Sequence, residues 1–142
     1  MYKKNIYPEG ITRITASSEK PNYTTSGMGT LYFLLDGITE PTWADFAWTP
    51  DANDEKPTLI LKLPKAKALE RLILYSPGMT LAKGKVFVGD KTIPFDAVGK
   101  KVIEVKWNQS SADTVKIEFE RTGATPAKGP FQKVFLSEIE LY

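Results

Sequence analysis

The clearest alternation of apolar and polar residues in this sequence runs through residues 102–120, which read VIEVKWNQSSADTVKIEFE. In its first part Ile103, Val105 and Trp107 alternate with Glu104 and Lys106. The second part repeats the pattern with Val115, Ile117 and Phe119. Because successive side chains of a strand point to opposite faces, each part predicts a strand with one buried face, and Trp107 is expected in the core.

Further segments of strand composition lie on both sides of this pair. Strands are predicted within residues 11–16, 58–63, 68–75, 85–88, 92–95 and 133–142. Pro64 is expected to end the strand at 58–63, because proline has no N–H to donate. The short apolar run 31–35 favours a single helical turn. About seven or eight short strands with no helical period between them predict an all-β fold, an antiparallel β-sandwich or jelly roll.

Length and composition are those of one ordinary folded domain. The 142 residues include 42% hydrophobic and 25% charged residues, so we expect a single domain over 1–142 with a leading segment at 1–10. No run approaches the roughly 18–20 apolar residues of a membrane span, and the first residues lack the apolar region of a signal peptide. We expect a monomer.

Several functional classes lack the residues that they need. The chain has no cysteine and no histidine, which removes thiol nucleophiles, disulfides and the usual general base. The net charge of +2 is scattered and excludes nucleic acid as a partner. The one close carboxylate pair, Glu138 and Glu140, is expected to face outward from a strand by alternation, so an enzyme is the poorest interpretation.

A loop of unusual character follows the apolar run 31–35. Residues 36–43 read DGITEPTW, in which Gly37 can take a positive φ, Pro41 fixes its own φ, and threonine and aspartate oxygens can bond to nearby backbone. This composition predicts a loop that holds a fixed, irregular shape.

The order of these segments resembles the discoidin, or coagulation factor 5/8 type C, domains of the galactose-binding-like superfamily, including family 32 carbohydrate-binding modules. The resemblance rests on residues 14–18, ITASS; Asp36-Gly37 followed by Trp43; residues 57–63, PTLILKL; residues 85–90, KVFVGD; residues 114–119; and the closing SEIELY at 137–142. Departures are Lys62 and Thr58, where the family often has Asp and Trp, and the missing cysteines. The resemblance implies a β-sandwich and a binding function.

Many modules of this type hold a structural calcium between the Asp-Gly loop and the last strand. The resemblance places this ion on Asp36, with Thr39 or Thr42, and on Glu138. Calcium takes about six to eight oxygen ligands, which two carboxylates, a hydroxyl and loop carbonyls could supply. The alternative is that Asp36 is a turn residue and Glu138 only the solvent-facing side of a strand.

A sugar site needs an aromatic platform flanked by hydrogen-bonding side chains on a rigid rim. By position in the family Phe131 would be the platform and Arg121 a donor, although Phe131 could equally be core. Other loops offer Tyr23 and Trp48, while Trp43 aligns with the family's buried tryptophan.

The leading hypothesis is a non-catalytic carbohydrate-binding module, an accessory domain of a larger bacterial glycan-processing or surface protein that acts outside the cytoplasm, at the cell surface, extracellularly or in the periplasm. The alternative is a protein-interaction or spacer module of the same fold without a sugar site. Membrane lipid is a third and less favoured partner, for which only Met28 and residues 79–81 offer apolar loop tips.

Overall fold

The computed structural model of the chain describes residues 13–18, 31, 34, 47–51, 54–79, 81–121 and 136–142, with Arg121 described by its main chain. The predicted site residues Tyr23, Asp36, Thr39, Thr42 and Phe131 lie outside this part, as does Trp43. Leu31 and Leu34 both have 3₁₀-helical conformation, in agreement with the helical turn expected at 31–35.

The described residues form an antiparallel β-structure. Its strands are β1 (Arg13–Ala16), β2 (Thr58–Tyr75), β3 (Leu81–Val88), β4 (Lys91–Asp96), β5 (Val102–Arg121) and β6 (Glu138–Leu141). They are hydrogen-bonded in the order β1-β2-β5-β3-β4, and β6 pairs with β2.

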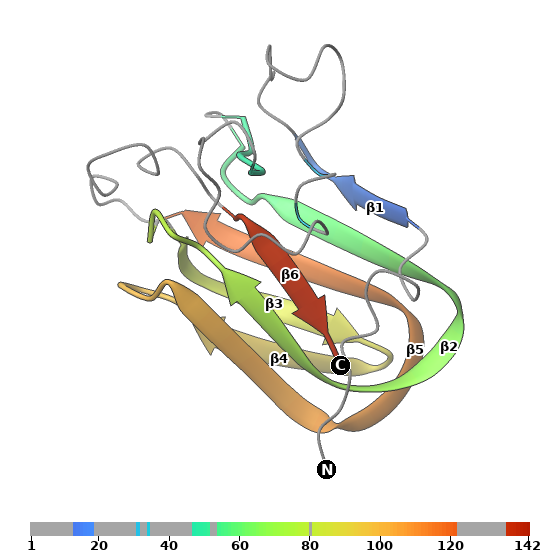
Figure 1. Ribbon diagram of the computed structural model, residues 1–142. Coiled ribbons are helices and arrows are strands. Elements are labelled where there is room, and N and C mark those ends of the chain that lie inside the picture. Colours follow the sequence, from blue (N-terminus) through green and yellow to red (C-terminus); the bar gives the residue numbers. More distant parts are fainter. Residues whose placement is uncertain are drawn as a thin grey trace.

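Two of these strands are long and bend back on themselves, which makes two layers from one hydrogen-bonded sheet (Figure 1). The larger layer contains β1, residues 58–62 of β2, residues 114–121 of β5, β3 and β4. The smaller layer contains residues 102–106 of β5, residues 71–75 of β2, and β6. The predicted antiparallel sandwich is confirmed.

The bends correct the sequence-based boundaries. Residues 58–63 and 68–75 were expected as two strands ended and separated at Pro64, but they belong to one strand, as do residues 102–107 and 114–120. The β2–β5 register passes from Lys62↔Thr114 directly to Lys67↔Ala112, so Pro64 lies where the ladder is interrupted. Proline has no N–H to donate to the neighbouring strand, so one inter-strand hydrogen bond is missing at the bend, but strand β2 continues through it.

The core lies between the two layers and follows the predicted alternation. Ile103, Val105, Val115, Ile117, Phe119, Ile139 and Leu141 are all buried, and Trp107 packs at the margin of the same cluster. The indole Nε1 of Trp107 donates to the Leu69 carbonyl at 2.9 Å, which satisfies its polar atom beside the bend.

Because β2 and β5 both double back, their first and last residues lie at the same end of the sandwich, which we call the loop end (Figure 1). β3 begins there, where Leu81 pairs with Arg121, and β6 begins there, where Glu138 pairs with Tyr75. The opposite end, which we call the bend end, contains the bends of β2 and β5 and the C-terminal Tyr142, whose carbonyl accepts from the Glu70 N–H at 2.8 Å.

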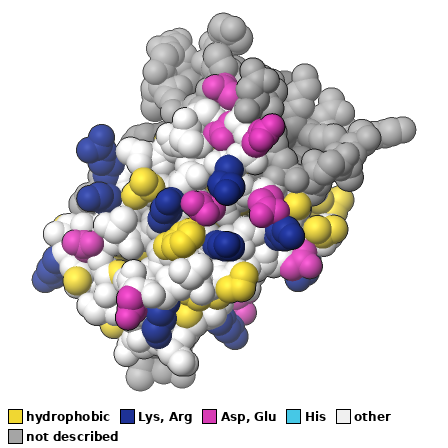
Figure 2. Space-filling model, turned by 180° about the vertical axis from the view of Figure 1, so that it is seen from behind, with side chains coloured by type: hydrophobic (Ala, Val, Ile, Leu, Met, Phe, Trp, Pro, Cys, Tyr) yellow, Lys and Arg dark blue, Asp and Glu magenta, His cyan; other side chains and the backbone are white. Residues whose placement is uncertain are grey.

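Charges of both signs are interspersed on the rear face of the molecule, with hydrophobic side chains between them (Figure 2). On the outward face of the larger layer, Lys116 pairs with Glu118 at 3.3 Å and Lys83 lies 3.9 Å from Glu120. Within the described part of the chain, no helix is long and apolar enough to cross a membrane.

Candidate functional site

Trp48 joins three segments at the loop end. Its main chain pairs with Leu136 through bonds of 2.9 and 3.1 Å, and its indole Nε1 donates to the Ser18 carbonyl at 3.0 Å. The centre of its ring lies 5.9 Å from the centre of the Phe119 ring in β5. Trp48 is 0% exposed and its ring is part of the hydrophobic core. The expectation that Trp48 contacts a ligand is therefore corrected.

The position of Trp48 nevertheless organises the loop end. Ser18, Ala47 and Leu136 are described residues that adjoin the segments 19–30, 35–46 and 122–135, and Trp48 follows Ala47 directly. Those segments carry Tyr23, Asp36 and Phe131. Contacts to one tryptophan therefore hold together one described end of each of three segments that are far apart in the sequence.

The serines at 17 and 18 in the ITASS motif hold the neighbouring turn. Ser17 Oγ and Ser18 Oγ donate to the same carboxylate oxygen of Asp54, at 2.5 and 2.6 Å. Ser17 Oγ accepts from the Thr58 N–H and Ser18 Oγ from the Asp51 N–H, both at 3.0 Å. Nothing in the local sequence distinguished Asp54 from the other charges of the polar stretch after Trp48, because its partners are 36 and 37 residues away.

For the predicted ligand residues Arg121 and Phe131, only the positions of nearby main-chain groups are described. The main chain of Arg121 ends β5 at the loop end, opposite Leu81. The segment that contains Phe131 begins after Arg121 and reaches Leu136, which pairs with Trp48. The predicted pairing of Phe131 with Arg121 in one site is thus compatible with the strand ends, and it stays a prediction.

Glu138 is buried, contrary to the solvent exposure expected from alternation. Its residue is 2% exposed although Ile139 and Leu141 take the core face of β6. An ionised carboxylate that loses its water needs hydrogen bonds, a cation or a metal in exchange. A buried carboxylate oxygen is also the hard ligand that calcium prefers. Within the described residues there is no group of three or more acidic side chains that could hold a metal, and the other expected ligands lie outside them.

Glu140 also lies in a network rather than in open solvent. Tyr75 Oη donates to its Oε2 at 2.9 Å, and Tyr142 Oη donates to its Oε1 at 2.7 Å. The guanidinium of Arg71 lies 4.1 Å from the centre of the Tyr142 ring and bonds Glu104 at 3.2 Å. Burial, followed by the bond to Glu140, raises the pKa of Tyr75 to about 12. Both oxygens of Glu140 are therefore occupied by phenols, which suits a structural role.

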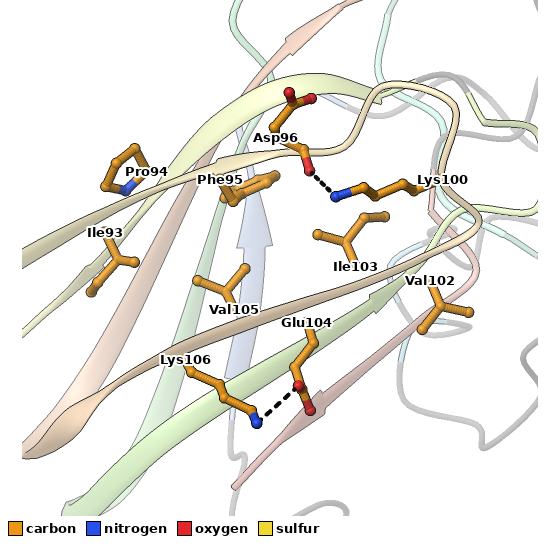
Figure 3. A pocket seen from close by; sticks show the side chains of 10 residues that line it. All are labelled: Ile93, Pro94, Phe95, Asp96, Lys100, Val102, Ile103, Glu104, Val105 and Lys106. Carbon is orange, nitrogen blue, oxygen red and sulfur yellow. Dashed lines mark hydrogen bonds and ion pairs between the residues drawn. The ribbon is translucent and has the colours of Figure 1, made fainter.

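A groove of about 270 Å³ opens on the flank of the sandwich, between β4 and the first part of β5 (Figure 3). Ile103 and Val105 point from β5 toward β4, where Ile93 and Phe95 complete an apolar floor. The charged rim consists of Asp96, Lys100, Glu104 and Lys106. Sequence patterns could not reveal this groove, because its two walls are edges of different layers.

The fold is that of known carbohydrate-binding modules. No protein-family model matches the sequence, and a comparison with curated proteins found no match. Among solved structures, the chain is similar to chitosan-binding module 1 from a chitosanase/glucanase of Paenibacillus sp. IK-5, with a TM-score of 0.72 and 15% identity over 99% of both chains. It is also similar to CpGH89CBM32-5 from Clostridium perfringens in complex with GalNAc-β-1,3-galactose, with a TM-score of 0.61 and 17% identity over 92% of this chain and 94% of that one.

A third similar structure contains several domains. It comprises the CBM32-1, CBM32-2 and M60 catalytic domains of Clostridium perfringens ZmpB, with a TM-score of 0.66 and 14% identity over 97% of this chain and 15% of that one. At these identities the likeness shows the fold, which is the β-sandwich of family 32 and related modules. The resemblance noted in the sequence is therefore confirmed at the level of the fold.

Proposed function

We propose that this chain is a non-catalytic carbohydrate-binding module and acts as an accessory domain of a larger extracellular or surface protein. The observation that carries the proposal is the match to a chitosan-binding module along 99% of both chains. The match to part of a protein that also contains a catalytic domain supports the accessory role.

The arrangement at the loop end supports a binding site there. Connecting segments carry function when a rigid scaffold gathers them, and contacts to Trp48 hold one end of each of the segments 19–30, 35–46 and 122–135. We propose Phe131 as the platform for a sugar ring, Arg121 as a hydrogen-bond donor, and Tyr23 as a further contact.

A non-catalytic role agrees with the chemistry of the acidic residues. The sequence has no histidine or cysteine. Of the two carboxylates of β6, Glu138 is buried and Glu140 accepts hydrogen bonds from two phenols, so neither is placed to act on a substrate. Hydrolysis of a glycosidic bond needs two carboxyl groups that face the same substrate.

Calcium is proposed as a structural ion on Glu138, Asp36 and a threonine oxygen of Thr39 or Thr42. The burial of Glu138 at the loop end supports the site. When bound, the ion would supply charge neutralisation to Glu138 and a link between β6 and the Asp-Gly loop. It has no role in a reaction.

A glycan array with the whole 142-residue chain tests the proposed function. Chitosan oligosaccharides and GalNAc-β-1,3-galactose should be included, because similar structures are described with these ligands. We expect a Kd between about 1 mM and 1 μM for the glycan that responds. Phe131→Ala should weaken this binding at least about tenfold.

Phe87→Ala is the matched control. Phe87 lies on the outward face of the larger layer with Lys116 Nζ 5.3 Å from its ring centre, away from the loop end. This variant should leave the Kd unchanged. A chain that binds no glycan on the array would contradict the proposal and favour the spacer role.

A further inference from the structure

The groove between β4 and β5 is bordered by two sheet edges that do not pair with each other. β4 pairs with β3 alone, and residues 102–106 of β5 pair with β2 alone, so in the described part of the chain no strand occupies the other edge of either segment. Main-chain groups at such an edge are free to pair with an added strand.

The hydrogen bonds at the strand ends determine which main-chain groups face the groove. The Ser76 N–H donates to the Lys101 carbonyl, so by alternation along the antiparallel ladder the N–H and C=O groups of Val102, Glu104 and Lys106 face away from β2. These three residues present up to three donors and three acceptors to the groove.

The opposite edge is different because it contains a proline. The Ala97 N–H donates to the Ala82 carbonyl, so the same alternation turns Pro94 outward from β3. Pro94 has no N–H and blocks strand addition at β4, which is a common protection of sheet edges. Residues 102–106 contain no proline, so of the two edges only that of β5 is open to pairing.

Apolar surface is concentrated at the same place. Among the described residues, the exposed large hydrophobic side chains are Val98, at 63%, and Val102, at 55%. Val102 lines the groove and Val98 lies in the turn between β4 and β5. On the groove floor Ile93 and Phe95 are partly exposed and can contact alternate side chains of an extended segment, whereas Ile103 and Val105 are buried.

The charges of the groove favour an acidic occupant. Glu104 lies between two cations, since it pairs with Arg71 at 3.2 Å and with Lys106 at 3.3 Å. Asp96 Oδ1 accepts from the Val98 N–H at 3.0 Å, which is a neutral group.

The two remaining lysines next to the groove contact neutral groups. Lys91 Nζ donates to the Asn108 carbonyl at 2.8 Å, and Lys100 Nζ donates to the Asp96 carbonyl at 3.3 Å. In the described part of the chain neither lysine lies within ion-pair distance of a carboxylate. They lie near opposite ends of β4. With Arg71 and Lys106 they make four cations against the two carboxylates of Asp96 and Glu104, so the groove has an excess of positive charge.

We propose that the edge of β5 at residues 102–106 binds an extended peptide strand in which apolar residues alternate with polar ones and an acidic residue stands at each end. The peptide pairs with the main chain of Val102, Glu104 and Lys106, places its apolar side chains on the groove floor, and brings its carboxylates to Lys91 and Lys100. This strand addition is a known mode of peptide recognition. The volume of about 270 Å³ is too small to enclose most compact ligands but suits a strand laid along an edge.

The test uses the whole chain and an acetylated, amidated peptide with the sequence Glu-Val-Thr-Val-Thr-Val-Glu. We expect the amides of Val102, Glu104 and Lys106 to shift in NMR titrations and to exchange with solvent more slowly when the peptide is bound. The same peptide with lysine in place of both glutamates should bind at least about fivefold more weakly, because its charges repel Lys91 and Lys100.

Val102→Pro removes one outward N–H without breaking the β2–β5 ladder, and Val102→Thr is the matched control that keeps the N–H and the branched side chain. The proline variant should bind the peptide about three- to tenfold more weakly than the threonine variant, as expected for one lost hydrogen bond. Equal binding by the two variants, or peptide-induced shifts only at other amides, would overturn the proposal.

Two other occupants give distinct results that would also overturn it. Slower exchange of the same three amides without peptide, together with dimers in sedimentation, would assign the edge to a second copy of the chain. Shifts at these amides with an oligosaccharide of glucuronic acid, but none with the peptide, would assign the groove to an acidic glycan. If the proline variant does not fold, the exchange of the three amides in the unmodified chain still decides between these outcomes.

Discussion

The phenol of Tyr75 donates a hydrogen bond of 2.9 Å to Glu140 Oε2, and so joins the end of one bent strand to the last strand of the chain. The two residues are 65 positions apart. Tyr75 pairs in register with Glu138, and Ile73 pairs with Glu140, so the bond crosses the smaller layer diagonally. The interaction ties the C-terminal strand to the bent sheet.

The stability of the fold should fall at alkaline pH because of Tyr75. Its pKa is raised from the usual 10.0 to about 12, first by burial and then by the bond to Glu140. A raised pKa means that this contribution is fully present below about pH 10 and is lost as the pH rises toward about 12. Urea unfolding at several pH values across this window should show the decline. Tyr75→Phe should flatten it and cost about 1–2 kcal/mol below this window, and a decline of unchanged size in that variant would refute the assignment.

Trp48 should act on stability and not on glycan contact. Trp48→Phe removes the indole bond to Ser18 and leaves a small void in the core, so we expect a loss of about 2–3 kcal/mol in the free energy of unfolding. Trp107→Phe removes a comparable bond to Leu69 from a half-buried site and should cost less. Urea titrations of both variants measure the difference. A Trp48→Phe variant that is fully stable but has lost its glycan would show that the ring contacts ligand after all.

Asp54 lies in a polar, charged stretch of the sequence, but its hydrogen bonds to Ser17 and Ser18 should make it important for the stability of the loop end. Its carboxylate accepts from Ser17 and Ser18, which would lose their acceptor in Asp54→Ala, at a cost of about 1–3 kcal/mol. Asp113→Ala removes an exposed acidic residue whose carboxylate accepts from the adjacent Thr114 hydroxyl, and should change stability by less than about 0.5 kcal/mol. Thermal unfolding followed by circular dichroism compares the two, and equal effects would contradict the structural role.

Calcium should stabilise the chain if Glu138 is one of its ligands. At a concentration about 100 times the Kd, a ligand that binds only the folded state adds about 2.7 kcal/mol. We expect calcium to raise the melting temperature and a chelator to lower it again. Glu138→Gln should abolish this response, while Glu140→Gln should keep it, because Glu140 is held by two phenols. A melting temperature that is insensitive to calcium and to chelator would exclude the site.

Local alternation determined a large part of this structure. Ile103, Val105, Val115, Ile117 and Phe119 face the core as their spacing predicts, because the direction of a side chain depends only on its place in an extended chain. The order of the segments also sufficed to indicate the sandwich fold.

Pairing between distant segments decided the rest. Only the ladder between β2 and β5 shows that the strand continues through Pro64. Only the tertiary structure shows that Glu138 is buried, although alternation assigns its side chain to solvent. Trp48 belongs to the core because Ser18, Phe119 and Leu136 meet around it, and the groove exists because two edges from different layers come close. The alternation of side chains along a strand depends only on residues that are neighbours in the sequence. Burial, and the exposure of a sheet edge, depend on which distant residues meet across the sandwich.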